Sequence, residues 1–197
     1  LLSSNIKPDQ SSLKVAVESS NLDLFKRIIG KGVQVTDNSV LTAAIDKNNV
    51  EITKAALNNG ANVNMGLQHA ATKKNKPFVI LCLDNGANGD GAANYAVTSK
   101  DVALINDLLL KYNISGDVIL RESVAANNLE SAKIALDNGF ANPDSQMKNV
   151  ADNNKPEFIN LFLDYGADPD LAMAGVIKNN RPTELKRLIQ YGANVEK

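Results

Sequence analysis

A short glycine-centred motif that recurs every 26 to 28 residues is the feature that most constrains the fold of this chain. Its copies read Gly-Ala-Asx-x-Asx or a close variant, where Asx is aspartate or asparagine. They lie at residues 60–64, 86–90, 139–144, 166–170 and 192–195, with a weaker copy at 32–35. A further copy is expected near residue 112, where Asn113 takes the place of the glycine. A fixed period of this length is typical of stacked repeats, so seven units of one kind account for nearly the whole chain from Ser11 onward.

Each unit reads as two short helices. The second helix precedes the motif, as in residues 49–60, where Ile52, Ala55 and Ala56 recur at the spacing of one helical face. The glycine that follows ends the helix, because glycine adopts the left-handed conformation of a C-terminal cap at little cost. The other second helices are expected at 22–31, 76–85, 102–111, 129–138, 157–165 and 183–191. First helices, which we expect to be shorter, are predicted at 40–47, 67–73, 92–99, 119–126, 147–153 and 172–179.

The units are expected to form a single array after a polar lead-in at residues 1–10. Their approximate bounds are 11–38, 39–65, 66–91, 92–117, 118–145, 146–170 and 171–197. One helix pair cannot bury its own apolar face, so neighbouring units must stack. The large side chains expected to fill the seam between units are Ile28, Leu57, Phe78, Leu83, Leu109, Leu136, Phe158, Phe162 and Leu188.

These residues resemble the repeat of the ankyrin family. Residues 49–64 and 156–170 follow the second half of the family repeat, and residues 39–44 follow its first half loosely. The family unit has about 33 residues, and the shorter unit here lacks the segment in which the family carries a β-hairpin finger. The family's Thr-Pro-Leu-His signature is also largely lost. The resemblance implies an all-α solenoid of about seven stacked helix-turn-helix units with short loops and little or no β-structure.

Composition narrows the classes of function. A net charge of −1 argues against a nucleic-acid-binding protein, and no apolar run reaches the length of a membrane span. One cysteine and one histidine exclude a disulfide framework within the chain and any metal site built on several of these residues. We therefore expect no cofactor, no metal and no catalytic residues.

Four features that could carry chemistry have simpler structural readings. Cys82 and His69 fall in one unit and could form a nucleophilic dyad, but we interpret Cys82 as core and His69 as a partly buried structural residue. The glycine-rich segment 86–91 lacks the Gly-Lys-Ser/Thr of a phosphate loop, and residues 164–170 lack the spacing of a calcium loop. Both are interpreted as repeat turns.

The resemblance also suggests where a partner would bind. In the family, residues near the end of the first helix and the residue before the terminal glycine line the concave or top face. Carried over by position, the first set supplies Asp46, Lys47, Thr72, Lys73, Thr98, Ser99, Asp152, Asn153, Lys178 and Asn179. The second set supplies Tyr165 and Tyr191, and tyrosine is favoured at binding hot spots. Alternatively, both tyrosines simply cover a neighbouring loop.

The resulting hypothesis is a non-enzymatic module that binds a partner protein through its solenoid surface. The alternative is a targeting or autoinhibitory domain of a larger enzyme or secreted effector, since the chain starts without methionine and ends inside the motif. We therefore expect the chain to be cut from something longer. The expected location is the cytoplasm, or the host-cell cytosol for an effector. The sequence names no partner and leaves the oligomeric state open.

Overall fold

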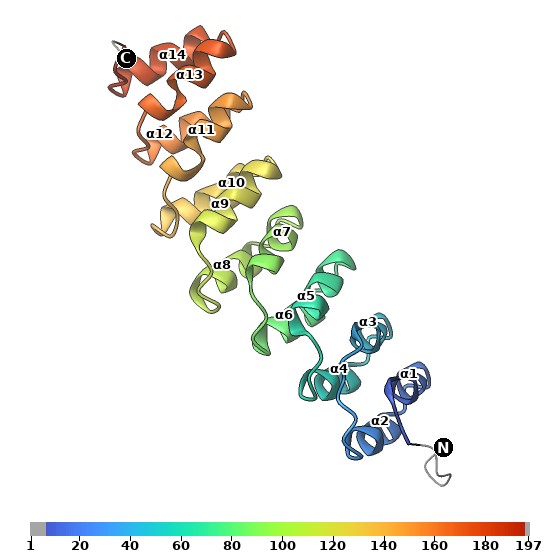
Figure 1. Ribbon diagram of the computed structural model, residues 1–197. Helices are drawn as coiled ribbons and strands as arrows, with labels where there is room; N and C mark the ends of the chain where they lie inside the picture. The colour runs from blue at the N-terminus through green and yellow to red at the C-terminus, as the bar shows by residue number, and fades with distance from the viewer. Residues whose placement is uncertain (1–6, 196–197) are drawn as a thin grey trace. The chain divides into compact units, whose positions relative to one another are not determined.

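The computed structural model describes residues 7–195, and these residues form fourteen α-helices and no strand. The part of the lead-in at residues 1–6 lies outside the described residues. The helices are α1 (Gln10–Glu18), α2 (Leu22–Ile29), α3 (Asn38–Asp46), α4 (Val50–Leu57), α5 (Val63–Thr72), α6 (Lys76–Asp84), α7 (Asp90–Thr98), α8 (Val102–Leu110), α9 (Gly116–Ala125), α10 (Leu129–Asp137), α11 (Asp144–Asp152), α12 (Pro156–Asp164), α13 (Asp170–Lys178) and α14 (Pro182–Gln190). Consecutive helices pair as hairpins joined by three-residue turns, which confirms the all-α repeat architecture (Figure 1).

The chain divides into two compact units, Leu1–Ala92 and Ala93–Lys197, with the division inside α7. In the first compact unit, α1, α3 and α5 pack side by side as one layer, and α2 packs on α4 in a second layer. In the second compact unit, α9, α11 and α13 form one layer and α8, α10, α12 and α14 form the other. Each compact unit thus consists of two layers of helices around an apolar seam.

Large apolar side chains fill these seams as the spacing predicts. Of the nine residues expected there, eight are buried, and Leu57 at the end of α4 is half-buried. In the second compact unit the rings of Phe158 and Phe162 meet edge to face, with centroids 5.9 Å apart. The neighbours of these rings are mostly aliphatic, in keeping with the low aromatic content.

The first helices begin two to four residues earlier than predicted and are as long as the second helices, so the expectation of a shorter first helix is wrong. The cause is capping within the glycine-centred motif. The side chain of Asn62 accepts hydrogen bonds from the backbone N–H groups of Asn64 and Met65, which starts α5 directly after Asn62. A cap of this kind contributes about 1 kcal/mol to helix stability. The interval between units is therefore even shorter than the sequence suggested.

Residues with a left-handed backbone conformation follow the second helix of each repeat, as predicted. The motif glycines have positive φ, and Asn113 replaces glycine in the fourth unit with φ of 53°. The residue after each first helix and its cap is also left-handed. It is an asparagine in four units, but it is Ser20, Lys74 and Lys100 in the others. Residues with a Cβ atom are strained in this region, and asparagine is strained least.

Replacing Lys74 with asparagine is therefore expected to stabilise the protein by about 0.5 kcal/mol. Lys74 has φ of 55° and an exposed side chain, so the substitution removes strain without removing packing. Chemical denaturation followed by circular dichroism measures the change. The reciprocal control is Asn180→Lys, at φ of 50°, which should lose a similar amount. Equal stability of both variants and the parent would contradict the prediction.

Candidate binding surface

Ten of the predicted partner-binding residues occupy equivalent places in the fold. Each pair is the last residue of a first helix and the residue that follows it. We call these the helix-end pairs. They are Asp46 and Lys47 at α3, Thr72 and Lys73 at α5, Thr98 and Ser99 at α7, Asp152 and Asn153 at α11, and Lys178 and Asn179 at α13. Eight of these residues are exposed, while Asp152 and Asn179 are half-buried.

The charged helix-end pairs of the first compact unit bridge consecutive repeats. Oδ1 of Asp46 lies 2.8 Å from Nε2 of His69 and 3.4 Å from Nζ of Lys73. Lys47 Nζ lies 3.1 Å from a carboxylate oxygen of Glu18. The hydrogen bond with His69 holds the pKa of Asp46 below its ordinary value. These groups are partly exposed, so each ion pair contributes little stability and stays accessible to a partner.

The polar helix-end pairs bond mainly to the backbone. The hydroxyls of Thr72, Thr98 and Ser99 donate to the carbonyl four residues earlier in their own helices. The Asn179 amide donates to the Ala151 carbonyl at 2.9 Å and so links α13 to the preceding repeat. Asp152 pairs with Lys148 one turn earlier in α11. The exposed hydroxyls are thus held in fixed orientations on a rigid scaffold.

The two tyrosines hydrogen-bond to aspartates of the preceding repeat. The Tyr165 hydroxyl donates to Asp137, and the Tyr191 hydroxyl donates to Oδ1 of Asp164 at 2.6 Å. The bond to Asp137 raises the pKa of Tyr165 to about 12. Arg187 also donates to Asp164 at 2.8 Å and lies over the Tyr191 ring. Tyr165 is half-buried, whereas Tyr191 is 45% exposed.

The tyrosines and the helix-end pairs lie at opposite ends of the helix hairpins. The helices of one hairpin are joined by a three-residue turn and run antiparallel. A helix-end pair stands at this turn, and a tyrosine stands at the far end of the second helix. The structure therefore separates two sets that the resemblance had grouped near one face.

A ladder of hydrogen bonds joins consecutive repeats at the motif, and the sequence analysis did not foresee it. The second Asx of one motif accepts from the backbone N–H of the first Asx in the next unit. We call this the Asx ladder. Its bonds join Asn64 to Asn88 (2.7 Å), Asp117 to Asn142 (2.8 Å), Asp144 to Asp168 (2.7 Å) and Asp170 to Asn194 (2.6 Å). The sequence signal for the ladder is the pair of Asx residues in the motif. The first Asx caps the helix that follows, and the second accepts the hydrogen bond from the next repeat.

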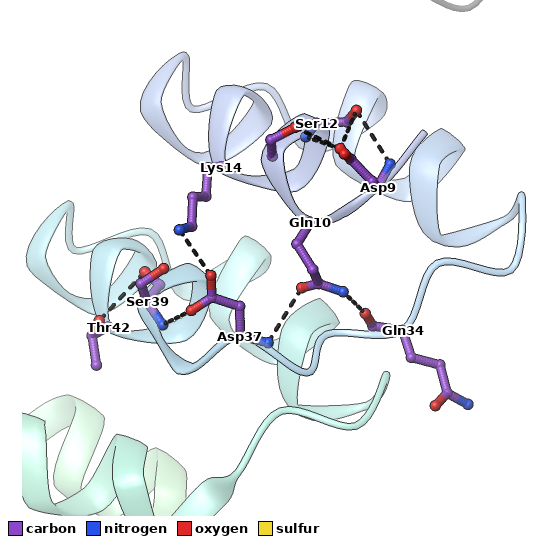
Figure 2. A network of polar contacts seen from close by, with 9 residues as sticks. Asp9, Gln10, Ser12, Lys14, Gln34, Asp37, Ser39 and Thr42 are labelled. Carbon is purple, nitrogen blue, oxygen red and sulfur yellow. Dashed lines mark hydrogen bonds and ion pairs between the residues drawn. The ribbon is translucent and has the colours of Figure 1, made fainter. Parts of the chain in front are cut away.

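Glutamine makes the corresponding contact between the first two repeats. Gln10 Oε1 accepts from the backbone N–H of Asp37 at 3.3 Å, and its amide nitrogen donates to the Gln34 carbonyl (Figure 2). Asp37 also caps α3 by accepting from the Ser39 N–H at 2.8 Å, and it pairs with Lys14 at 2.8 Å. These bonds join α1 to the start of α3.

The stability of this network should depend on acidic pH. The hydrogen-bonded ion pair with Lys14 and the N–H of Ser39 lower the pKa of Asp37 from 3.8 to about 2. A lowered pKa in the folded state stabilises the protein above 3.8, and this stability is lost as pH falls from 3.8 through about 2. Denaturation midpoints across this range should fall less steeply in Asp37→Asn, which keeps a capping oxygen but does not titrate. Identical pH profiles for parent and variant would contradict the assignment.

His69 and Cys82 have the structural surroundings predicted for them. His69 is half-buried and paired with Asp46. Cys82 is fully buried, and burial raises the pKa of its thiol to about 11. A thiol with that pKa is protonated at neutral pH and is a poor nucleophile.

Two irregular turns expose apolar side chains that the sequence analysis did not single out. Leu110, at the end of α8, is 70% exposed where α10 and α12 have Asp137 and Asp164. Phe140 is 36% exposed and is an extra residue in the motif at 139–144. The sequence signals are the absent glycine near 112 and the added residue at 140. Both turns belong to the second compact unit.

The helices of residues 7–195 are each eight to ten residues long. No helix among them has the length and apolar character required to cross a bilayer. The same residues contain no group of three or more His, Cys, Asp or Glu side chains placed to hold a metal ion.

The architecture is similar to that of a solved repeat protein. The crystal structure of the human ASB11 ankyrin repeat domain matches with a TM-score of 0.54, over 92% of this chain and 98% of that chain. The two sequences are 23% identical. No protein-family model and no curated protein matches the chain. The chain therefore has the ankyrin-repeat fold, as the motif predicted, and at this identity the likeness is one of fold.

Proposed function

We propose that this chain is a non-enzymatic protein-binding module whose helix-end pairs contact the partner. The observation that carries the proposal is the equivalent placement of these pairs in the repeats of two compact units, each of which has a buried seam and bonds of the Asx ladder. Side chains that differ between units on a fixed backbone suit recognition of one particular surface. The ankyrin-repeat fold supports a protein as the partner.

Charge-changing substitutions at the helix-end pairs test this proposal. Thr98 and Lys178 are exposed and lie in the second compact unit. The double variant Thr98→Arg/Lys178→Glu changes the chemistry of the proposed contact surface and leaves the core intact. The matched control, Thr183→Arg/Lys186→Glu, makes the same two changes at exposed positions of α14.

Affinity capture from lysate with mass spectrometry would first identify a partner, and calorimetry with the purified partner would then measure Kd. We expect the helix-end variant to weaken binding by about tenfold or more and the control to bind like the parent, because interface hot spots each contribute about 2 kcal/mol or more. A loss confined to the control would overturn the surface assignment. Failure of the folded parent to capture any protein would count against the function itself.

The tyrosines are a second predicted contact, at the opposite ends of the hairpins. Tyr165→Ala/Tyr191→Ala removes the rings together with their bonds to Asp137 and Asp164. Tyr165→Phe/Tyr191→Phe removes the bonds alone and serves as the control, and circular dichroism verifies folding of both. Binding lost with alanine but kept with phenylalanine supports ring contact with the partner. Unchanged binding in both variants removes the tyrosines from the interface.

A further inference from the structure

Asparagine followed by glycine occurs four times in this chain, at residues 59–60, 85–86, 88–89 and 138–139. Such a pair can rearrange without an enzyme, because the glycine nitrogen attacks the side-chain carbonyl carbon of the asparagine. Glycine favours the attack, since it carries no side chain to shield its nitrogen. The orientation of the amide then decides which pair reacts, because reaction rates depend steeply on the placement of the reacting atoms.

In three of the pairs the amide is turned away from the following glycine. The amide nitrogens of Asn59, Asn85 and Asn138 donate to the carbonyl four residues earlier, at 2.8, 2.8 and 3.3 Å. Each side chain therefore points back along its helix. The N–H groups of the glycines that follow are also engaged, since each donates to a carbonyl of the last helical turn. In each of these three pairs, hydrogen bonds therefore hold the asparagine amide and the glycine nitrogen away from each other.

The amide of Asn88 points the other way. Its Oδ1 accepts from the backbone N–H of Asp90 at 3.0 Å, so the side chain folds forward across Gly89. Within residues 7–195 no hydrogen bond engages the Gly89 N–H. The Asp90 N–H is also aimed at the oxygen that becomes negatively charged when the carbonyl carbon is attacked, and such donors stabilise an oxyanion. The capping geometry of the motif therefore assembles the reacting groups at this pair.

Equivalent caps elsewhere in the chain have the same forward-turned amide without the glycine. Asn62 and Asn142 accept from the N–H two residues later, but they are followed by Val63 and Pro143. The branched valine side chain shields its own nitrogen, and proline has no N–H to lose. Only Asn88 combines this orientation with a following glycine among the described asparagines.

We infer that Asn88 is a site of spontaneous deamidation. The Gly89 nitrogen forms a bond to Cγ of Asn88, the bond from Cγ to Nδ2 breaks, and Nδ2 leaves as ammonia with the proton that Gly89 gives up. Water then opens the five-membered succinimide ring. Opening at one carbonyl gives aspartate, and opening at the other gives isoaspartate, in which the main chain runs through the side-chain carbon.

The two products differ in their effect on the Asx ladder. Aspartate keeps the capping oxygen, as Asp168 does at the equivalent place in a later unit. Isoaspartate adds a methylene to the main chain between the Asn88 N–H, which bonds to Asn64 at 2.7 Å, and the first turn of α7. That bond and the cap can no longer form together. The reaction thus loosens the link between α5 and the start of α7.

Peptide mapping after incubation of the folded chain in heavy-oxygen water at mildly alkaline pH tests the inference. The heavy oxygen marks deamidation during the incubation, and mass spectrometry assigns it to a residue. We expect conversion at Asn88 to be about tenfold faster or more than at Asn59, Asn85 or Asn138. Equal rates at all four pairs, or faster conversion at one of the other three, would overturn the inference.

Gly89→Pro is the matched variant, since proline stands at the equivalent Pro143 and Pro169 with φ of −61° and −65°. It removes the attacking N–H, so label at residue 88 should vanish while the other three pairs convert as before. Asn88→Asp keeps the cap without the amide and serves if the proline variant does not fold. On long incubation the parent should lose thermal stability faster than Asn88→Asp, because the glycine nitrogen attacks an ionised carboxylate more slowly than an amide. Label at residue 88 in folded Gly89→Pro would contradict the mechanism.

Discussion

Replacing Phe162 with alanine is expected to lower the free energy of unfolding of the second compact unit by about 4 kcal/mol. Phe162 is fully buried in the seam of that unit, where its ring meets Phe158 edge to face. The substitution removes the apolar transfer energy of a whole ring and leaves a cavity that surrounding helices fill only in part. Because each repeat is stabilised chiefly by its neighbours, the loss should spread to the repeats on either side.

Phe140→Ala is the matched control for this experiment. It makes the same chemical change in the same compact unit, but Phe140 is 36% exposed in a turn. We expect a loss of about 1 kcal/mol or less, since exposed substitutions rarely cost more. Urea denaturation followed by circular dichroism measures both variants. Similar losses at the two positions would contradict the assignment of Phe162 to the seam.

Gly116→Ala is expected to cost about 3 kcal/mol through a steric clash with the backbone. A Cβ atom at the first residue of α9 would lie 2.2 Å from the carbonyl oxygen of Phe140 and 2.7 Å from the nitrogen of Ala141. Backbone atoms cannot swing aside as the end of a side chain can, so α9 or the turn at 139–144 must shift. The Asp117 bond of the Asx ladder, which reaches Asn142 in that turn, would be strained as well.

Gly91→Ala provides the comparison, because its Cβ would meet a flexible side chain instead. The nearest atom is Cδ2 of Leu67 at 3.3 Å, which can move by a few tenths of an ångström. Alanine is also favoured over glycine inside a helix by up to about 1 kcal/mol. We expect little net change in the midpoint of thermal unfolding. A loss of stability in Gly91→Ala as large as that in Gly116→Ala would contradict the steric explanation.

The motif itself predicted most of the helix ends. The glycines and Asn113 have the left-handed conformations expected of them, and the asparagines after the first helices share this conformation. These are local effects, since a residue's own φ preference does not depend on distant parts of the chain. The starts of the first helices were predicted too late for a local reason as well. The first Asx of the motif is a residue type typical of a helix cap, but the prediction placed this residue in the turn and not at the start of the helix.

Less of the candidate binding surface than of the helix ends could be predicted from the sequence. Position in the repeat correctly placed the helix-end pairs at equivalent sites, because the repeat is regular. It did not reveal that Asp46 pairs with His69, or that Tyr191 bonds to Asp164 of the preceding repeat. These contacts join residues more than twenty positions apart, and their geometry follows from how closely successive units stack.

The repeat period, the two helices of each repeat, the residues of the seam and the left-handed residues of the motif could all be predicted from residue types and their spacing. Those properties follow from hydrophobic spacing and from the backbone preferences of glycine and asparagine, which act within a few residues. Which polar groups of consecutive repeats meet follows only from how the repeats stack. The Asx ladder, the tyrosine–aspartate bonds and the close approach of Phe140 to Gly116 exist only after stacking fixes the spacing of neighbouring helices. Hydrogen bonds and steric contacts depend on distance to within a few tenths of an ångström, and a pattern of residue types does not contain that information.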